Sequence, residues 1–127
     1  MKVLESAENY LEAILMVRQE KGAVRSIDIV NHLGFSKPSV SVAMKHLESD
    51  DLIHRDNDGY ICLTESGEEI AQMIYERHSL LTDIFIRLGV DPEVAREDAC
   101  KIEHDLSEQT FEQIKRAYTA HKEEYLK

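Results

Sequence analysis

Polar and apolar residues alternate with a helical period in the first third of the chain. This period predicts a helix over residues 5–20, which the turn EKGA ends. Two short helices follow over IDIVNHL and KPSVSVAMKHLESD, and only LGFS separates them. We expect Ser26 and Ser36 to cap these two helices. A short turn containing glycine between two helices is typical of a helix-turn-helix.

The segment after this motif has the pattern of a hairpin. DLIHR and YICLT are short runs rich in branched and aromatic residues, and the turn-forming residues DNDG join them. Such a hairpin is the wing of a winged helix. In the second helix of the motif Val40, Ala43, Met44 and Leu47 are expected to face the core, which leaves short and basic side chains free to enter a major groove of DNA. The candidate DNA-binding residues are Arg25, Ser36, Lys37, Pro38, Ser39, Ser41, Val42 and Lys45.

Three further helices are predicted in the second half of the chain. A long helix covers residues 64–88, a second follows over 92–106 after the cap Asp91, and Ser107 caps a third that extends to Tyr125. Their apolar stripes have no obvious partner within the chain. We therefore expect self-association through this half, and a two-fold dimer would match two half-sites on DNA.

Length and composition suit a mainly α protein in two parts. The 127 residues are 43% hydrophobic, which is enough for a core. We expect a winged helix-turn-helix DNA-binding domain over residues 1–68 and a helical dimerisation and metal-binding domain over 69–127. The sequence shows neither an apolar run of membrane-spanning length nor a signal-peptide core, so a cytoplasmic protein without a membrane partner is expected.

Charge is unevenly distributed along the chain. The net charge of −10 argues at first against nucleic acid, because affinity for DNA comes largely from neutralising phosphates. Residues 21–47, however, carry four basic side chains against one acid, whereas residues 67–127 carry eight against fourteen. A basic patch on an acidic body is compatible with DNA binding.

Three side chains that can ligate metals share one predicted helix. Cys100, Glu103 and His104 stand at spacings i, i+3 and i+4, so a thiolate, a carboxylate and an imidazole can converge. The alternative is a half-buried cysteine beside a solvated acid and histidine. The two cysteines lie far apart in sequence and are interpreted as reduced thiols, with Cys62 as a small core residue.

Five motifs together resemble one family across essentially the whole chain. They are ENYLEAI, SKPSVSVAMKHLESDDLI, LTESGEEIA, ERHSLL and ACKIEHDLS. The chain is similar to the diphtheria toxin repressor family of iron- and manganese-dependent transcriptional regulators, in the short form without an SH3-like domain. The resemblance implies a dimeric repressor of metal-uptake genes, which binds an inverted-repeat operator in double-stranded DNA when metal orients its winged helices.

The resemblance also implies a set of metal ligands. The cofactor would be Fe²⁺ or Mn²⁺, with Co²⁺ and Zn²⁺ as further candidates. Manganese-type members carry acids at the positions of Asn9 and Cys100, and iron-type members carry a thioether and a cysteine there, so this chain is a hybrid. At a second, iron-type site His78 is kept, but Thr82 and Arg96 replace two other ligands. The implied ligand positions are Asn9, Glu12, His78, Cys100, Glu103 and His104.

Each implied ligand has a structural alternative. Asn9 can form local hydrogen bonds, Glu12 can be a solvated acid, and His78 can be a core histidine bonded to a carbonyl. The sequence offers no HExxH motif and no second carboxylate pair, so an enzyme is not expected. The rival function is a metal-independent winged-helix transcription factor that senses a small molecule.

Overall fold

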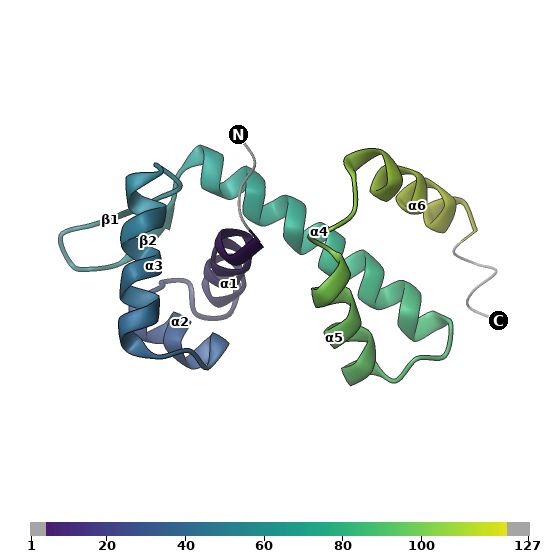
Figure 1. The fold of residues 1–127 in the computed structure, drawn as a ribbon, viewed down its shortest axis with the longest axis horizontal. Coiled ribbons are helices and arrows are strands. Elements are labelled where there is room, and N and C mark those ends of the chain that lie inside the picture. The colour runs from purple at the N-terminus through teal and green to yellow at the C-terminus, as the bar shows by residue number, and fades with distance from the viewer. Residues whose placement is uncertain (1–4, 122–127) are drawn as a thin grey trace. The chain divides into compact units, whose positions relative to one another are not determined.

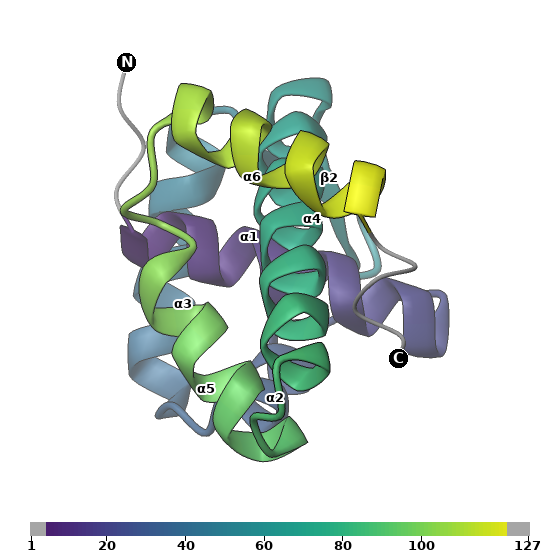
Figure 2. The same ribbon diagram turned by 90° about the vertical axis from the view of Figure 1, so that its right-hand side faces the viewer.

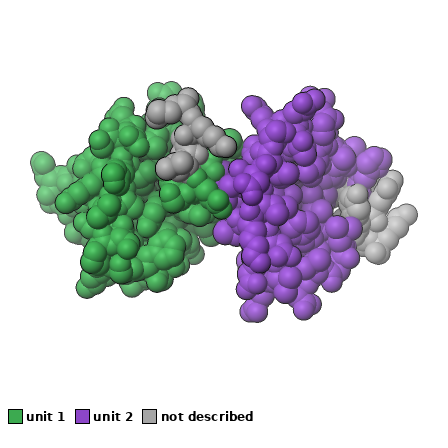
Figure 3. Space-filling model, viewed as in Figure 1, with its two compact units in different colours: residues 1–73 green, residues 74–127 purple. Residues whose placement is uncertain are grey.

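The computed structural model describes residues 5–121 and divides into two compact units. Unit 1 extends to Met73 and unit 2 begins at Ile74 (Figure 3). The described residues form six helices and one two-stranded antiparallel sheet, which confirms the prediction of a mainly α protein with a winged helix. None of the helices among residues 5–121 is long and apolar enough to cross a membrane.

Unit 1 contains the winged helix (Figure 1). Its core is formed by side chains with at most 1% exposure from the first and third helices and the first strand, among them Leu11, Ile14, Val40, Met44 and Ile53. The predicted inward face of the third helix is confirmed, except that Ala43 is only half-buried. The elements are α1 (Glu5–Lys21), α2 (Ser26–Leu33), α3 (Lys37–Ser49), β1 (Ile53–Arg55), β2 (Ile61–Leu63) and the start of α4 (Glu65–Arg87).

The ends of α2 and α3 follow from local chemistry. Gly34 has φ 73°, a left-handed conformation that costs glycine little, and its N–H donates to the carbonyl of Val30 to end α2. Ser36 is the N-cap of α3, as predicted, and its Oγ accepts from the N–H of Ser39 at 3.2 Å. The prediction for Ser26 was wrong by one residue. Arg25 is the N-cap of α2, and its N–H donates to Asp28 Oδ2 at 2.9 Å.

The wing hairpin is joined closely to the helix that follows it. Ile53 pairs with Leu63 and Arg55 with Ile61 in the antiparallel sheet. The backbone of α4 approaches the hairpin so closely that a Cβ on Gly67 would lie 1.9 Å from the carbonyl oxygen of Leu52. This close contact explains the glycine of the LTESGEEIA motif, because any side chain there would push α4 away from the wing.

Unit 2 packs α5 (Pro92–Ile102) and α6 (Glu108–His121) with the part of α4 from Ile74 onwards (Figure 2). Two fully buried alanines one turn apart, Ala95 and Ala99, give α5 a small and tightly packed face. Helix α5 ends at Ile102, four residues earlier than predicted. The predicted extension of the last helix from residue 122 to Tyr125 lies outside the described residues.

Candidate metal centre and nucleic-acid interface

Glu103 is the central acid of unit 2. It follows the last residue of α5 and keeps helical dihedral angles, φ −60° and ψ −26°, while its N–H donates to the carbonyl of Ala99. Its side chain is completely buried. A carboxylate is seldom buried to this extent without a cation or strong hydrogen-bond donors, because removing its charge from water is costly.

Two imidazoles lie next to this carboxylate. His78 of α4 places Nδ1 2.9 Å from Glu103 Oε2, and His104 places Nε2 3.4 Å from Glu103 Oε1. The side chain of His104 is 1% exposed and that of His78 is 18% exposed. The structure therefore brings three of the six predicted ligands together within unit 2.

One oxygen of Glu103 is suited to a cation. Although His104 is near, Oε1 makes no hydrogen bond to any residue that the structure describes. Buried polar atoms are nearly always satisfied, and an exception calls for a partner such as an ordered water or an ion. A carboxylate oxygen beside imidazole nitrogens is also a donor set that divalent transition metals accept. The residues present therefore fit a bound divalent metal.

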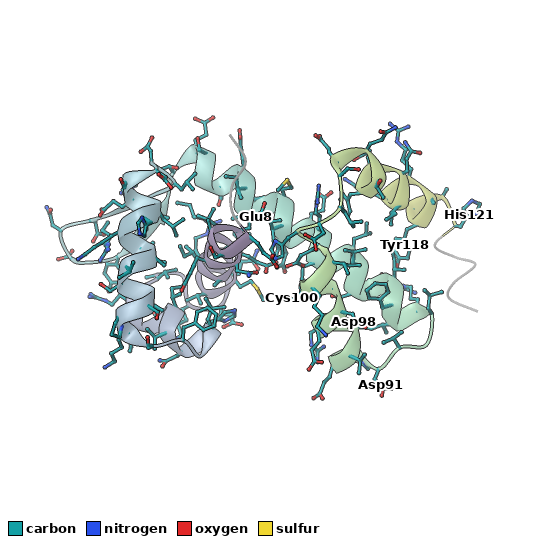
Figure 4. All side chains as sticks on the ribbon, viewed as in Figure 1. Glu8, Asp91, Asp98, Cys100, Tyr118 and His121 are labelled. Atoms are coloured by element: carbon teal, nitrogen blue, oxygen red, sulfur yellow. The ribbon has the colours of Figure 1, made fainter. Side chains whose placement is uncertain are left out.

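The other three predicted ligands belong to helices α1 and α5. Asn9 and Glu12 are three residues apart on α1 in unit 1, so they occupy neighbouring positions on one face of that helix. Cys100 is exposed on α5, one turn before Glu103 (Figure 4). Within residues 5–121, Cys100 belongs to no cluster of three metal-ligating atoms closer than 4.8 Å to one another. The other cysteine, Cys62, is half-buried on β2.

Sequence reasoning missed Arg77, the residue before His78. Its side chain is buried, and Nη1 donates to the backbone carbonyls of Glu103 at 3.0 Å and Leu106 at 2.7 Å. The guanidinium also lies over the ring of Phe111, 5.2 Å from its centroid. The only local signal was a charged residue on the side of α4 that the apolar pattern assigns to the core.

Helix α3 presents the side chains that a DNA-reading helix needs. Lys37 and Lys45 are exposed, and Val42 is 55% exposed although it is apolar. Ser36 and Ser39 are also exposed, and their hydroxyl groups are hydrogen-bonded to each other at 2.9 Å. Pro38 and Ser41 complete the exposed start of the helix. A groove of about 440 Å³ is lined by Ser26, Ile27, Val30, Lys37 and Ser41.

Arg25, the remaining DNA-binding candidate, contacts the wing. Its guanidinium lies over the ring of Tyr60, 4.1 Å from the centroid. Tyr60 and then the wing carboxylates of Asp58 and Asp56 raise the pKa of Arg25 above its ordinary value. The positive charge of Arg25 is thus partly balanced by the wing.

A winged helix with an exposed basic helix, followed by a helical unit with a buried carboxylate between two imidazoles, is typical of a metal-responsive DNA-binding regulator. Two family profiles match the chain in the same order. "Iron dependent repressor, N-terminal DNA binding domain" covers residues 2–60, and "Iron dependent repressor, metal binding and dimerisation domain" covers residues 64–123. The chain belongs to the iron-dependent repressor family.

Bacterial regulators are among its similar proteins. "Transcriptional regulator MntR" of Escherichia coli O6:H1 (strain CFT073) is 37% identical over 108 residues, which are 85% of this chain and 70% of that protein. "HTH-type transcriptional regulator MntR" of Bacillus subtilis (strain 168) is 33% identical over 109 residues, or 86% of this chain and 77% of that protein. The resemblance to the diphtheria toxin repressor family is thereby confirmed.

A solved structure supports the same fold. The crystal structure of T. acidophilum IdeR is 26% identical with a TM-score of 0.76, and the match covers 94% of this chain and 55% of that one. The chain thus spans about half the length of that protein.

This chain is itself a metal-dependent DNA-binding transcriptional repressor whose metal is Fe²⁺ or Mn²⁺. Its partners are DNA and a second copy of the chain, and its relatives are regulators rather than enzymes, as predicted.

Proposed function

We propose that His78, Glu103 and His104 form the centre of the metal site, and that Asn9, Glu12 and Cys100 are the remaining ligands. The observation that carries this proposal is the buried Glu103 carboxylate, whose Oε1 makes no hydrogen bond to the described residues. When bound, the metal supplies a positive charge that balances this carboxylate. The same family resemblance that supplied Glu103 supplies the other ligand positions.

The proposed ligands bear on the choice of metal. A thiolate at Cys100 favours the softer ions Fe²⁺, Co²⁺ and Zn²⁺, while the oxygens of Asn9 and Glu103 also suit Mn²⁺. Mn²⁺ binds most weakly in this series, so selectivity for it has to come from geometry and cellular supply. We propose Fe²⁺ as the first activator and Mn²⁺ as the second.

We propose that α3 reads DNA in the major groove and that a dimer presents two copies to an inverted-repeat operator. Support comes from the exposure of Lys37, Lys45 and Val42 on one helix. The lysines would contact phosphates, and Val42 would contact a thymine methyl group. Half-sites are then expected about 34 Å apart, or at a multiple of that distance. Ser39 and Ser41 would contribute hydroxyl contacts, whereas Arg25 would act mainly through its contact with the wing.

The proposed ligands connect metal to DNA by linkage. They come from α1, in the DNA-binding domain that we propose for residues 1–68, and from the proposed dimerisation domain over 69–127. A cation that takes ligands from both domains would restrict how the winged helix is oriented. Metal and operator should therefore tighten each other's binding by the same factor. The regulated genes would encode metal uptake, and the protein would act in the cytoplasm.

Equilibrium dialysis with Mn²⁺, and with Fe²⁺ under anaerobic conditions, tests the metal site. We expect stoichiometric binding in the wild type and its loss in Glu103→Gln and His104→Ala, together with loss of metal-dependent operator binding. Operator binding of equal strength with and without metal would instead support the metal-independent sensor. Selectivity is tested by Cys100→Glu, Asn9→Asp and the double variant, which should shift the response towards Mn²⁺. Equal responses in all four proteins would contradict a selective role for these positions.

A further inference from the structure

Two neighbouring residues of α4 contact Glu103, one at its side chain and the other at its backbone. His78 contacts the carboxylate, with Nδ1 2.9 Å from Oε2, and Arg77 donates to the backbone carbonyl of the same residue at 3.0 Å. All of these groups belong to unit 2. We propose that Arg77 is a positioning residue for the metal site, which sets the backbone that carries Glu103 and His104. This inference rests on the proposed metal-binding function.

The Arg77 contacts lie at the end of α5. The last carbonyls of a helix have no partner within it and carry the negative end of the helix dipole, so a buried cation there is favourable. Nη1 of Arg77 has two hydrogens, and it donates to the carbonyls of Glu103 and Leu106. These carbonyls bracket the turn between α5 and α6, in which His104 lies. One guanidinium nitrogen therefore fixes both ends of the segment that carries the two ligands.

Phe111 of α6, the helix that follows this turn, contacts the guanidinium of Arg77. The guanidinium carbon of Arg77 is 5.2 Å from the centroid of the Phe111 ring, which is buried on α6. A planar, delocalised cation stacks on such a ring more effectively than an ammonium group. Lysine should therefore supply the charge and a carbonyl contact but only part of the positioning, and glutamine should supply neither the charge nor the stacking.

Groups that orient metal ligands contribute to affinity without touching the metal. Removing such a partner typically weakens metal binding by about 10- to 100-fold. A purely structural arginine would behave differently. Its removal would lower the melting temperature of unit 2 and leave the affinity of the folded protein unchanged.

The test compares Arg77→Gln, Arg77→Lys and the matched control Arg87→Gln. Arg87 forms an ion pair in unit 2, with its Nε 3.0 Å from Asp83 Oδ2, and it is the last residue of α4, whereas Arg77 lies in the middle of that helix. Mn²⁺ affinity is measured by electron paramagnetic resonance well below the melting temperature of each folded variant. Backbone hydrogen exchange over residues 103–106 is measured in the metal-free protein.

We expect Arg77→Gln to weaken Mn²⁺ binding by about tenfold or more, Arg77→Lys to be intermediate, and Arg87→Gln to match the wild type. Exchange over residues 103–106 should accelerate in the Arg77 variants alone. Should Arg77→Gln fail to fold, Arg77→Lys provides the same comparison. Mn²⁺ affinity within about twofold of the wild type in the folded Arg77 variants would overturn the positioning role. A wild type that binds no divalent metal would instead overturn the proposed metal site itself.

Discussion

The substitution Glu103→Gln separates the cost of burying a carboxylate from its value as a metal ligand. Glutamine keeps the shape of the side chain and removes the charge. In the structure this carboxylate is fully buried, and one of its oxygens makes no hydrogen bond to the described residues. A buried neutral amide loses less solvation than a buried carboxylate. We therefore expect the free energy of unfolding without metal to stay equal or to rise by about 1–2 kcal/mol.

The effect of metal should have the opposite sign. At a free Mn²⁺ concentration of about 100 times the dissociation constant, the wild type gains about 2.7 kcal/mol from binding. If losing this ligand weakens binding by about 100-fold, the same Mn²⁺ concentration stabilises the variant by only about 0.4 kcal/mol. The difference of about 2.3 kcal/mol corresponds to about 9 °C in melting temperature for a protein of this size.

Calorimetric melting with and without MnCl₂ measures both effects in one protein. Glu76→Gln is the control, because Glu76 lies in the same unit and pairs with Lys115 at 2.9 Å but is half exposed. The control should keep the full Mn²⁺-induced rise in melting temperature. A rise in Glu103→Gln equal to that of the wild type would refute Glu103 as a ligand. A metal-free variant that melts well below the wild type would refute the argument about the buried charge.

Three further measurements test other parts of the molecule. Replacing Lys37 or Lys45 by alanine should lower the slope of log K against log salt by about one per lost phosphate contact, and an unchanged slope in both would remove α3 from the interface. The N–H of Arg25 and then the ammonium of Lys21 hold the pKa of Asp28 below its ordinary 3.8. The ionised Asp28 therefore stabilises the fold above pH 3.8, and this stabilisation is lost as the pH falls through the lowered pKa. The stability difference between the wild type and Asp28→Asn, from urea titrations, should therefore be present at pH 7 and shrink as the pH falls below 3.8, and a constant difference would contradict this reasoning. Light scattering should give twice the chain mass of 14.6 kDa, and a monomer at micromolar concentration would contradict the dimer.

Local sequence patterns determined most of the fold. The apolar period located the helices, Ser36 and Gly34 set the ends of α3 and α2, and the inward face of α3 followed from its spacing. These features depend on backbone conformation and on neighbours within a few residues, so their free energies are encoded in short segments. The exposure of the lysines of α3 was predictable for the same reason, because their positions lie outside the apolar face of that helix.

The candidate site depended on contacts that no short segment encodes. Spacing alone grouped Cys100, Glu103 and His104, but the structure exposes Cys100 and buries Glu103 beside His78, which is 25 residues away. Helix α5 also ends before the predicted residue, and the carbonyls of Glu103 and Leu106 bond to Arg77. Burial and distant partners are decided by how helices pack, since the energy of a buried charge depends on every group that surrounds it. The sequence therefore supplied the residue types that can bind a metal, and packing selected which of them share one buried site.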